Sequence, residues 1–179
     1  MTDQLNDKQM FEKLIHDKQL RVNLVKKNHL WFFNVYFAYH IAYPLAEFHR
    51  EFFRLTEDQN IKMAVISAFR GSAKSTILTT SHAIWAVFGI KEKRNVLIIS
   101  QTQNQAKIHF KNIKAELESN ELLKHDLGPF EEVSDEWNNS TIILKNSGAK
   151  ITAASLEQSI RGTKYRQYRP DLIICDDIE

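Results

Sequence analysis

The sequence predicts an α/β fold in which helices cover a mainly parallel sheet. From residue 59 onward, short β-rich apolar runs alternate with helix-like segments, which is the pattern of such a fold. Two of these runs end in polar residues, one in a lysine-containing loop and the other in acids. Because open α/β sheets bind ligands at the carboxyl ends of their strands, these two runs also indicate a site.

The composition of the 179 residues fits a globular protein of a reducing compartment. Hydrophobic residues make up 43% and charged residues 26%, and the net charge of +2 is compatible with a polyanionic partner without requiring one. Cys175 is the single cysteine and lies in an apolar run, so we predict a small buried side chain. The polar start of the chain is unlike a signal peptide, and we expect a cytoplasmic protein.

Residues 1–58 are predicted to form a helical segment ahead of the sheet. Over 3–27 we expect a surface helix whose apolar face comprises Phe11, Leu14, Ile15, Val22 and Val25. A charged helix is expected over 46–56.

Between these helices, residues 30–48 are unusually aromatic. A membrane-spanning helix needs about 20 mostly apolar residues, and this segment is interrupted by Asn34, His40 and Pro44. We therefore interpret it as a buried segment broken at the proline. Stacking on a base is the alternative role for its aromatic side chains, which are Trp31, Phe32, Phe33, Tyr36 and Phe37.

Residues 59–179 are predicted to form the sheet and its helices. An amphipathic helix is expected after the second strand, with its apolar stripe at Ala106, Phe110, Ile113 and Leu117. A helix is also expected over 74–88, ended by Gly89. The Asn-Ser-Gly turn at 146–148 predicts a hairpin. Strands are expected over 61–67, 95–100, 141–144, 150–153 and 171–179.

The loop AFRGSAKST, residues 68–76, resembles a phosphate-binding loop. The usual pattern is G-x-x-x-x-G-K-[ST], and alanine replaces both glycines, at Ala68 and Ala73. Such a loop needs a strand before it, backbone N–H groups at a helix N-terminus, and a lysine followed by a hydroxyl. We expect its residues to bind a nucleotide, namely Ala68, Phe69, Arg70, Gly71, Ser72, Ala73, Lys74, Ser75 and Thr76.

Arg70 adds a possible catalytic group to this loop. A guanidinium here can reach the γ-phosphate and stabilise charge as the phosphate bond breaks. The alternative interpretation is an exposed strand-to-helix turn with a solvated lysine and arginine.

The apolar run LIIC is followed by Asp176 and Asp177, which is typical of a magnesium-holding Walker B strand. Asp176 is expected to bind Mg²⁺ with Ser75, and Asp177 to orient the attacking water, with Glu179 as the second candidate for that role. Neighbouring side chains alternate along a strand, so both aspartates can face the nucleotide only if the strand turns at its tip. The alternative is a solvated acidic turn. Together, the two motifs favour an ATPase that uses ATP and Mg²⁺.

The combined pattern resembles the large subunit of bacteriophage terminases, the motor that packages DNA. The resemblance covers roughly residues 40–179 and lies in AFRGSAKST, in SIRGTKYRQYRPDLIICDDIE and in YPLAEFHREFF. It implies a P-loop NTPase of the RecA/ASCE-like kind, a three-layer sandwich with a mainly parallel sheet. Lys74, Ser75 and Thr76 would contact phosphates and Mg²⁺, Arg70 would sense the γ-phosphate, and His49 would lie near the adenine.

The resemblance also implies partners. These are double-stranded DNA, a portal protein and a small terminase subunit, with the ATPase assembled as a homo-oligomeric ring and no membrane involved. The run at 164–169, KYRQYR, interleaves basic and aromatic residues and is the better candidate for a DNA-facing surface than the basic turn of Lys91, Lys93 and Arg94.

The family continues beyond its Walker B strand into further strands and a nuclease domain, whose metal-binding acids are absent from these 179 residues. We therefore expect a sheet that is incomplete at its C-terminus and exposes apolar surface, and we assign no nuclease activity to these residues. A helicase-like P-loop ATPase is one alternative, and an inactive remnant that binds DNA or a partner is another.

Overall fold

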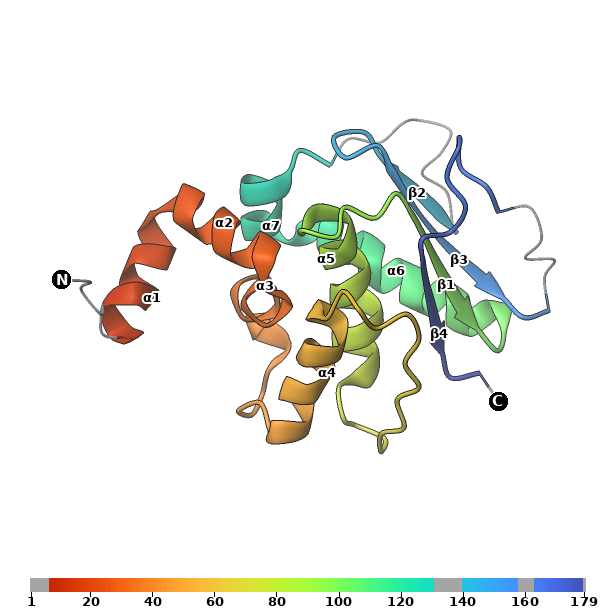
Figure 1. The fold of residues 1–179 in the computed structure, drawn as a ribbon, viewed down its shortest axis with the longest axis horizontal. Helices are drawn as coiled ribbons and strands as arrows, with labels where there is room; N and C mark the ends of the chain where they lie inside the picture. Colours follow the sequence, from red (N-terminus) through yellow and green to blue (C-terminus); the bar gives the residue numbers. More distant parts are fainter. Residues whose placement is uncertain (1–6, 131–139, 158–162, 179) are drawn as a thin grey trace.

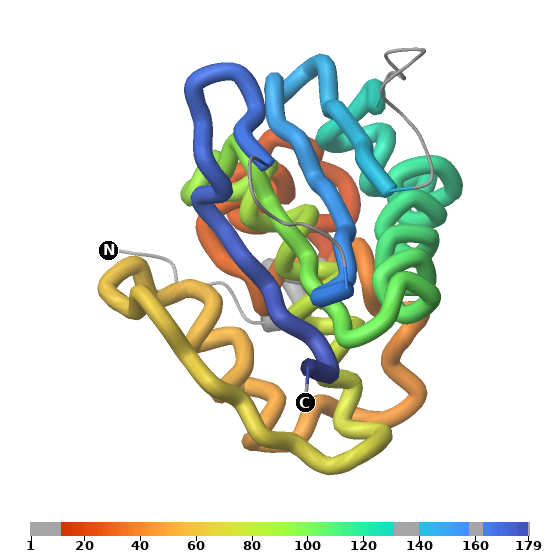
Figure 2. The backbone as a smooth tube through the Cα atoms, turned by 90° about the vertical axis from the view of Figure 1, so that its right-hand side faces the viewer, coloured from red at the N-terminus to blue at the C-terminus, as the bar shows by residue number. Residues whose placement is uncertain are grey.

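The computed structural model describes residues 7–130, 140–157 and 163–178, and it has the predicted α/β architecture. A four-stranded sheet carries helices on one of its faces (Figure 1). Figure 2, turned by 90°, looks onto the other face of the sheet, with the helices of residues 18–36 behind it. No helix covers this second face in the described residues, so the second helical layer of the expected three-layer sandwich is not seen there.

The N-terminal segment contains four α-helices instead of one long helix followed by a charged one. Asp17 ends the expected surface helix because its carboxylate accepts a hydrogen bond from Leu20 N at 3.0 Å and caps a new helix. Asn28 caps the next helix in the same way, through Trp31 N at 2.8 Å. The helices are α1 (Asp7–His16), α2 (Lys18–Lys27), α3 (His29–Tyr36) and α4 (Glu47–Glu57), with a 3₁₀ turn, η1 (Ala38–His40), after α3.

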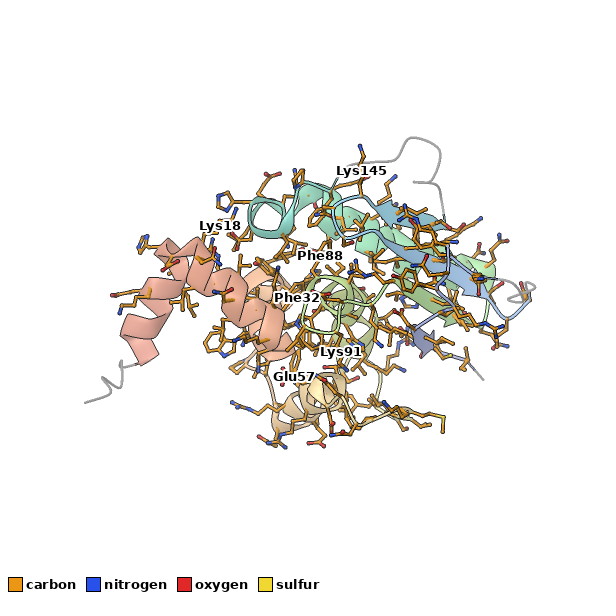
Figure 3. The ribbon with its side chains drawn as sticks, turned by 45° about the horizontal axis from the view of Figure 1, so that its top comes forward. Lys18, Phe32, Glu57, Phe88, Lys91 and Lys145 are labelled. Atoms are coloured by element: carbon orange, nitrogen blue, oxygen red, sulfur yellow. The ribbon has the colours of Figure 1, made fainter. Side chains whose placement is uncertain are left out.

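The first part of the aromatic segment belongs to the hydrophobic core, as predicted, whereas most residues from 38 to 48 are exposed, including Tyr39 and Tyr43. Phe32, Phe33, Tyr36 and Phe37 are buried, and they belong to the same core as the helix-facing residues of the sheet. Figure 3 shows Phe32 and Phe88 in the middle of the molecule, between the N-terminal helices and the sheet. Helix α3 ends well before Pro44. No helix in the described part of the chain combines the length and apolar character that a membrane span requires.

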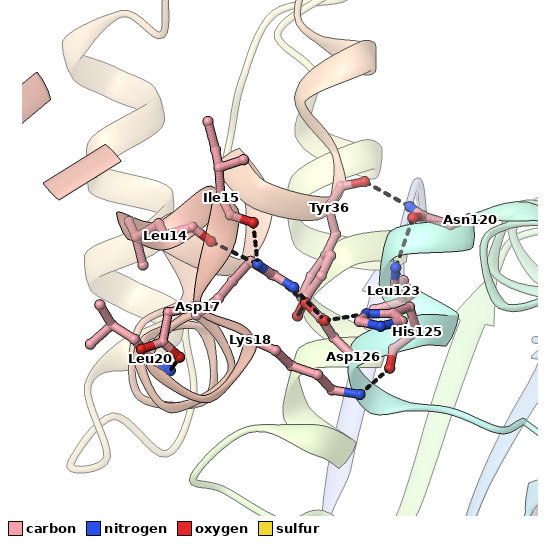
Figure 4. Close-up of polar contacts among 11 residues, drawn as sticks. Leu14, Ile15, Asp17, Lys18, Leu20, Tyr36, Asn120, Leu123, His125 and Asp126 are labelled. Atoms are coloured by element: carbon pink, nitrogen blue, oxygen red, sulfur yellow. Dashed lines mark hydrogen bonds and ion pairs between the residues drawn. The ribbon is translucent and has the colours of Figure 1, made fainter. Parts of the chain in front are cut away.

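A buried ion pair joins the N-terminal helices to the body of the protein. Arg21 of α2 donates through Nε and Nη2 to the two carboxylate oxygens of Asp126, at 2.6 and 2.7 Å. Its Nη1 donates to the carbonyls of Leu14 and Ile15, and the Tyr36 hydroxyl donates to Asp126 at 2.9 Å (Figure 4). This network closes the kink between α1 and α2. Ile15, expected on the buried face, is instead exposed.

The sheet contains β1 (Asn95–Ser100), β2 (Thr141–Leu144), β3 (Ala149–Ser155) and β4 (Leu172–Asp176) in the order β2-β3-β1-β4. Strand β1 is parallel to both β3 and β4, and β2 pairs antiparallel with β3 as the predicted hairpin. The register places Ser155 and Asp176 beside Ser100, on either side of it.

The helices against the sheet follow the predicted pattern. A π-helix, η2 (Ser75–Ser81), continues directly into α5 (His82–Phe88), which ends at Gly89 as expected. Helix α6 (Gln103–Ser119) is capped by Thr102, and it buries Ala106, Phe110, Ile113 and Leu117 as the periodicity predicted. The short helix α7 (Glu121–Leu127) carries Asp126.

Two predictions about strands are wrong. Residues 61–67 form no strand, and Met63 and Val65 are 86% and 92% exposed. This run is β-rich in composition, but in the structure it has no strand neighbour to complete its hydrogen bonds. Cys175 is exposed and not buried, because the alternation of β4 turns Ile174 and Asp176 toward the helices and Cys175 toward the face that no described helix covers.

Candidate phosphate-binding site

The loop and the acidic strand end meet at the carboxyl edge of the sheet. Lys74 Nζ lies 2.9 Å from Asp177 Oδ1 and 3.9 Å from Asp176 Oδ1, although Lys74 and Asp177 are 103 residues apart in sequence. The hydrogen bond between Lys74 and Asp177 raises the pKa of Lys74, and the same bond lowers the pKa of Asp177. Both side chains are therefore held in their charged forms.

The turn at the tip of β4 has the form that this arrangement requires. Asp176 is the last residue of β4, and Asp177 follows it in the left-handed region with φ of 49°. Aspartate is among the few non-glycine residues that enter this region readily. The turn interrupts the alternation of the strand, so both carboxylates come within 4 Å of the same ammonium group.

Asp176 differs from Asp177 in its surroundings. The side chain of Asp176 is 3% exposed, and its Oδ2 accepts a hydrogen bond from Thr79 Oγ1 at 2.7 Å. His109 Nε2, on α6, lies 3.5 Å from the same oxygen. Sequence reasoning missed both contacts. For Thr79 the sequence held a usable signal: it lies four residues after Ser75, which places both on the same face of the expected helix. The sequence held no such signal for His109.

The loop itself adopts left-handed backbone conformations at two positions. Gly71 has φ of 84° and Ala73 has φ of 56°. The alanine at 73 therefore occupies a conformation that costs about 1 kcal/mol for a residue with a Cβ atom. This cost gives a physical reason why the usual pattern has glycine at position 73, before the lysine.

His49 connects the loop to α4. Its Nδ1 accepts a hydrogen bond from Ala46 N at 2.9 Å, so Nε2 carries the proton and donates to the Ser72 carbonyl at 3.1 Å. Both ring nitrogens thus form hydrogen bonds with the backbone, so His49 joins the start of α4 to the loop. Phe48 and Phe69 meet edge to face beside it, with ring centroids 5.3 Å apart, and Phe69 is 66% exposed.

The remaining predicted site residues occupy different positions. Arg70 is exposed and makes no hydrogen bond or ion pair within the described residues. Ser75 and Thr76 are half-buried in the first turn of η2, and the hydroxyl bonded to Asp176 belongs to Thr79 and not to Ser75.

Ala68 packs against the core, and Ser72 is buried. Glu179, together with Arg161 and Gly162 of the terminase-like pattern, lies outside the described residues.

The oxygen donors at this edge suit Mg²⁺. Two carboxylates and the hydroxyls of η2 are hard ligands, and magnesium in phosphate sites takes only one or two carboxylates besides water and substrate oxygens. The described residues contain no group of three or more His, Cys, Asp or Glu side chains that could hold a metal. Asp176 and Asp177 would hold the ion together with a bound phosphate.

The basic and aromatic run at 164–169 lies at the opposite, amino end of the strands. Tyr165 and Tyr168 exchange backbone hydrogen bonds of 2.9 and 2.8 Å, which close a tight turn. Asp171 then accepts hydrogen bonds from Arg94 N and Asn95 N, both at 2.9 Å, so it fixes the start of β4 against β1. This run and the phosphate-binding loop therefore flank opposite ends of the sheet.

Comparisons of the chain with protein-family models, with curated proteins and with solved structures give no match.

Proposed function

We propose that the protein is a P-loop ATPase that binds Mg-ATP at the carboxyl edge of the sheet and hydrolyses it. One observation carries the proposal: Lys74 at the helix start lies within 4 Å of two carboxylates that the last strand delivers from a distant part of the chain. A solvated turn would not need this arrangement, because neither a lysine nor an acid requires a partner in water. A phosphate site needs both, since lysine supplies positive charge and the acids hold Mg²⁺.

The residues would share the chemistry as follows. The N–H groups of the first turn of η2 and the Lys74 ammonium would bind the phosphates, with Lys74 leaving Asp177 for the ligand. Mg²⁺ supplies charge neutralisation for the phosphate oxygens when bound. Asp177 is exposed and is the first residue after β4, so its carboxylate can orient a water molecule. Glu179 is the second candidate for this role.

Arg70 is available for the catalytic role proposed for it. The described residues give it no partner, and it lies four residues before Lys74 in the same loop. A guanidinium that is free in the absence of ligand can turn to the γ-phosphate as charge develops there.

For the work that ATP hydrolysis drives, we propose translocation of double-stranded DNA, as in the large subunit of phage terminases. This step rests on the sequence resemblance, with the portal protein, the small subunit and a ring of copies as the implied partners. A helicase-like ATPase shares the same nucleotide chemistry, and strand separation assayed on forked DNA would favour it. An inactive remnant that binds DNA or a partner would hydrolyse no nucleotide.

The first test is nucleotide binding. We expect Lys74→Ala to weaken the binding of a fluorescent ATP analogue at least tenfold, because the variant removes the charge that faces the phosphates. Lys111→Ala is the matched control, since Lys111 is an exposed lysine on α6 outside the loop and the acidic strand end. Equal affinity of the wild type and Lys74→Ala would sink the proposal, provided that both variants melt like the wild type.

A further inference from the structure

The two oxygens of the Asp176 carboxylate have different neighbours. Oδ2 accepts the hydrogen bond from Thr79 Oγ1 at 2.7 Å and has His109 Nε2 at 3.5 Å. Oδ1 has neither of these contacts and lies 3.9 Å from Lys74 Nζ, on the side of the phosphate-binding loop. The carboxylate is therefore held by one oxygen and presents the other to the loop.

His109 makes no hydrogen bond in the described residues that would explain its position. His109 is 12% exposed, and its Nδ1 is buried without a hydrogen-bond partner in the described residues. The ring thus contacts Asp176 on one side and no polar group on the other. A histidine needed only for packing of α6 would be replaced at no cost by an apolar side chain, since an unpaired buried nitrogen is unfavourable.

A third polar group lies next to Asp176 on β1. Ser100 pairs in register with Asp176, and its hydroxyl is fully buried without a partner in the part of the chain that the structure describes. Unpaired buried polar atoms beside a carboxylate mark a place where a polar ligand or water completes the hydrogen bonds.

We infer that Thr79 and His109 are positioning residues for Asp176, which hold Oδ2 so that Oδ1 is the oxygen presented to Mg²⁺. The inference rests on the proposed function and assigns to this site two residues that lie outside the loop and strand motifs. Groups that orient a metal-binding carboxylate are generally worth about 10- to 100-fold in metal affinity. Neither residue is proposed to touch the nucleotide.

The readout is the gain in ATP affinity that Mg²⁺ produces, measured as the ratio of the Kd without Mg²⁺ to the Kd with saturating Mg²⁺. We expect Thr79→Val to lower this ratio about tenfold or more while leaving the Kd without Mg²⁺ close to that of the wild type. Thr79→Ser keeps the hydroxyl and should restore the ratio. A purely structural role would lower the melting temperature without changing the ratio.

Thr80→Val is the matched control, because Thr80 is the neighbouring buried threonine of η2, whereas the hydroxyl bonded to Asp176 is that of Thr79. It should keep the wild-type ratio. His109→Phe, measured in the same way, should lower the ratio by a smaller factor because its contact is longer, and it tests the inference if Thr79→Val does not fold. Wild-type ratios in both Thr79→Val and His109→Phe would overturn the inference. If the wild type itself did not bind ATP, the proposed function would be overturned instead.

Discussion

The ion pair of Arg21 with Asp126 and that of Lys74 with Asp177 both join segments more than 100 residues apart in sequence. The first is enclosed, with side chains 6% and 0% exposed, and the second is open, at 27% and 60%. Arg21 and Asp126 also have further partners in Leu14, Ile15, Tyr36 and His125, whereas Asp177 accepts its one described hydrogen bond from Lys74.

This difference in burial distinguishes an ion pair that stabilises the fold from one whose members can exchange each other for a ligand. Burial alone would raise the pKa of Asp126, but hydrogen bonds from Arg21, His125 and Tyr36 outweigh burial and lower it. Such a network leaves no coordination site for a ligand. Separating Lys74 from Asp177 costs little free energy because the pair is exposed. Lys74 can therefore bind a phosphate group while Asp177 binds a water molecule.

The largest effect on stability is expected from breaking the enclosed pair. Arg21→Met leaves Asp126 buried without its cation, and we expect the free energy of unfolding to fall by about 3–5 kcal/mol in urea denaturation. The double variant Arg21→Met with Asp126→Leu should recover much of this loss, because two apolar side chains need no partner. If Arg21→Met lowered the free energy of unfolding by less than about 1 kcal/mol, the Arg21–Asp126 pair would contribute no more than the exposed pair of Lys74 and Asp177.

An intermediate effect is expected from acid, through the histidines behind η2. Burial lowers the pKa of His82 to about 3 and also lowers the pKa of His29, whose ring nitrogens contact Thr56 and Ser81. Below pH about 6.5 the unfolded chain binds protons that the folded protein does not, so stability should fall between pH 6.5 and pH 5.5 by up to about 1.4 kcal/mol for each histidine.

The variant His82→Phe should flatten this dependence when unfolding free energies are measured across the same pH range. Lys74→Ala should leave the slope between pH 6.5 and 5 unchanged, because Lys74 does not titrate there. An unchanged slope in His82→Phe would exclude His82 as a source of the acid sensitivity.

The smallest effect is expected from the open pair. Lys74→Ala should change the free energy of unfolding by less than about 1 kcal/mol, since exposed ion pairs contribute little. The difference from the wild type should shrink further in high salt, which screens exposed charges. If Lys74→Ala destabilised the protein as much as Arg21→Met, the contrast between the two pairs would be wrong.

Local sequence patterns predicted the elements that local physics decides. The stripe on α6, the hairpin of β2 and β3, the stop at Gly89 and the strand β1 all follow from periodicity and turn residues. The run 61–67 shows the limit, because its composition favours a strand and only a neighbouring strand can make it one. The break at Asp17 had a local signal in its capping carboxylate, which the long amphipathic pattern concealed.

The candidate site was predictable in its residue types but not in its contacts. The loop motif and the acidic strand end indicated Lys74, Asp176 and Asp177 correctly as neighbours. His109 carried no signal, because its place beside Asp176 depends on how α6 packs across β1 and β3. The same holds for Arg21 and Asp126, where a charged residue on an amphipathic helix gave no indication of its distant partner.

The strand order of the sheet also determines when the site can form during folding. Strand β4 pairs with β1, and the hydrogen bond of Asn95 N to Asp171, which lies just before β4, joins residues 76 apart. The hairpin of β2 and β3, in contrast, closes locally. Closing a long loop has an entropic cost that must be met before its contacts stabilise the chain, so non-local strand pairing is slow. Lys74 gains its acidic neighbours only when β4 has docked, and recovery of nucleotide binding during refolding would therefore report the final step of sheet assembly.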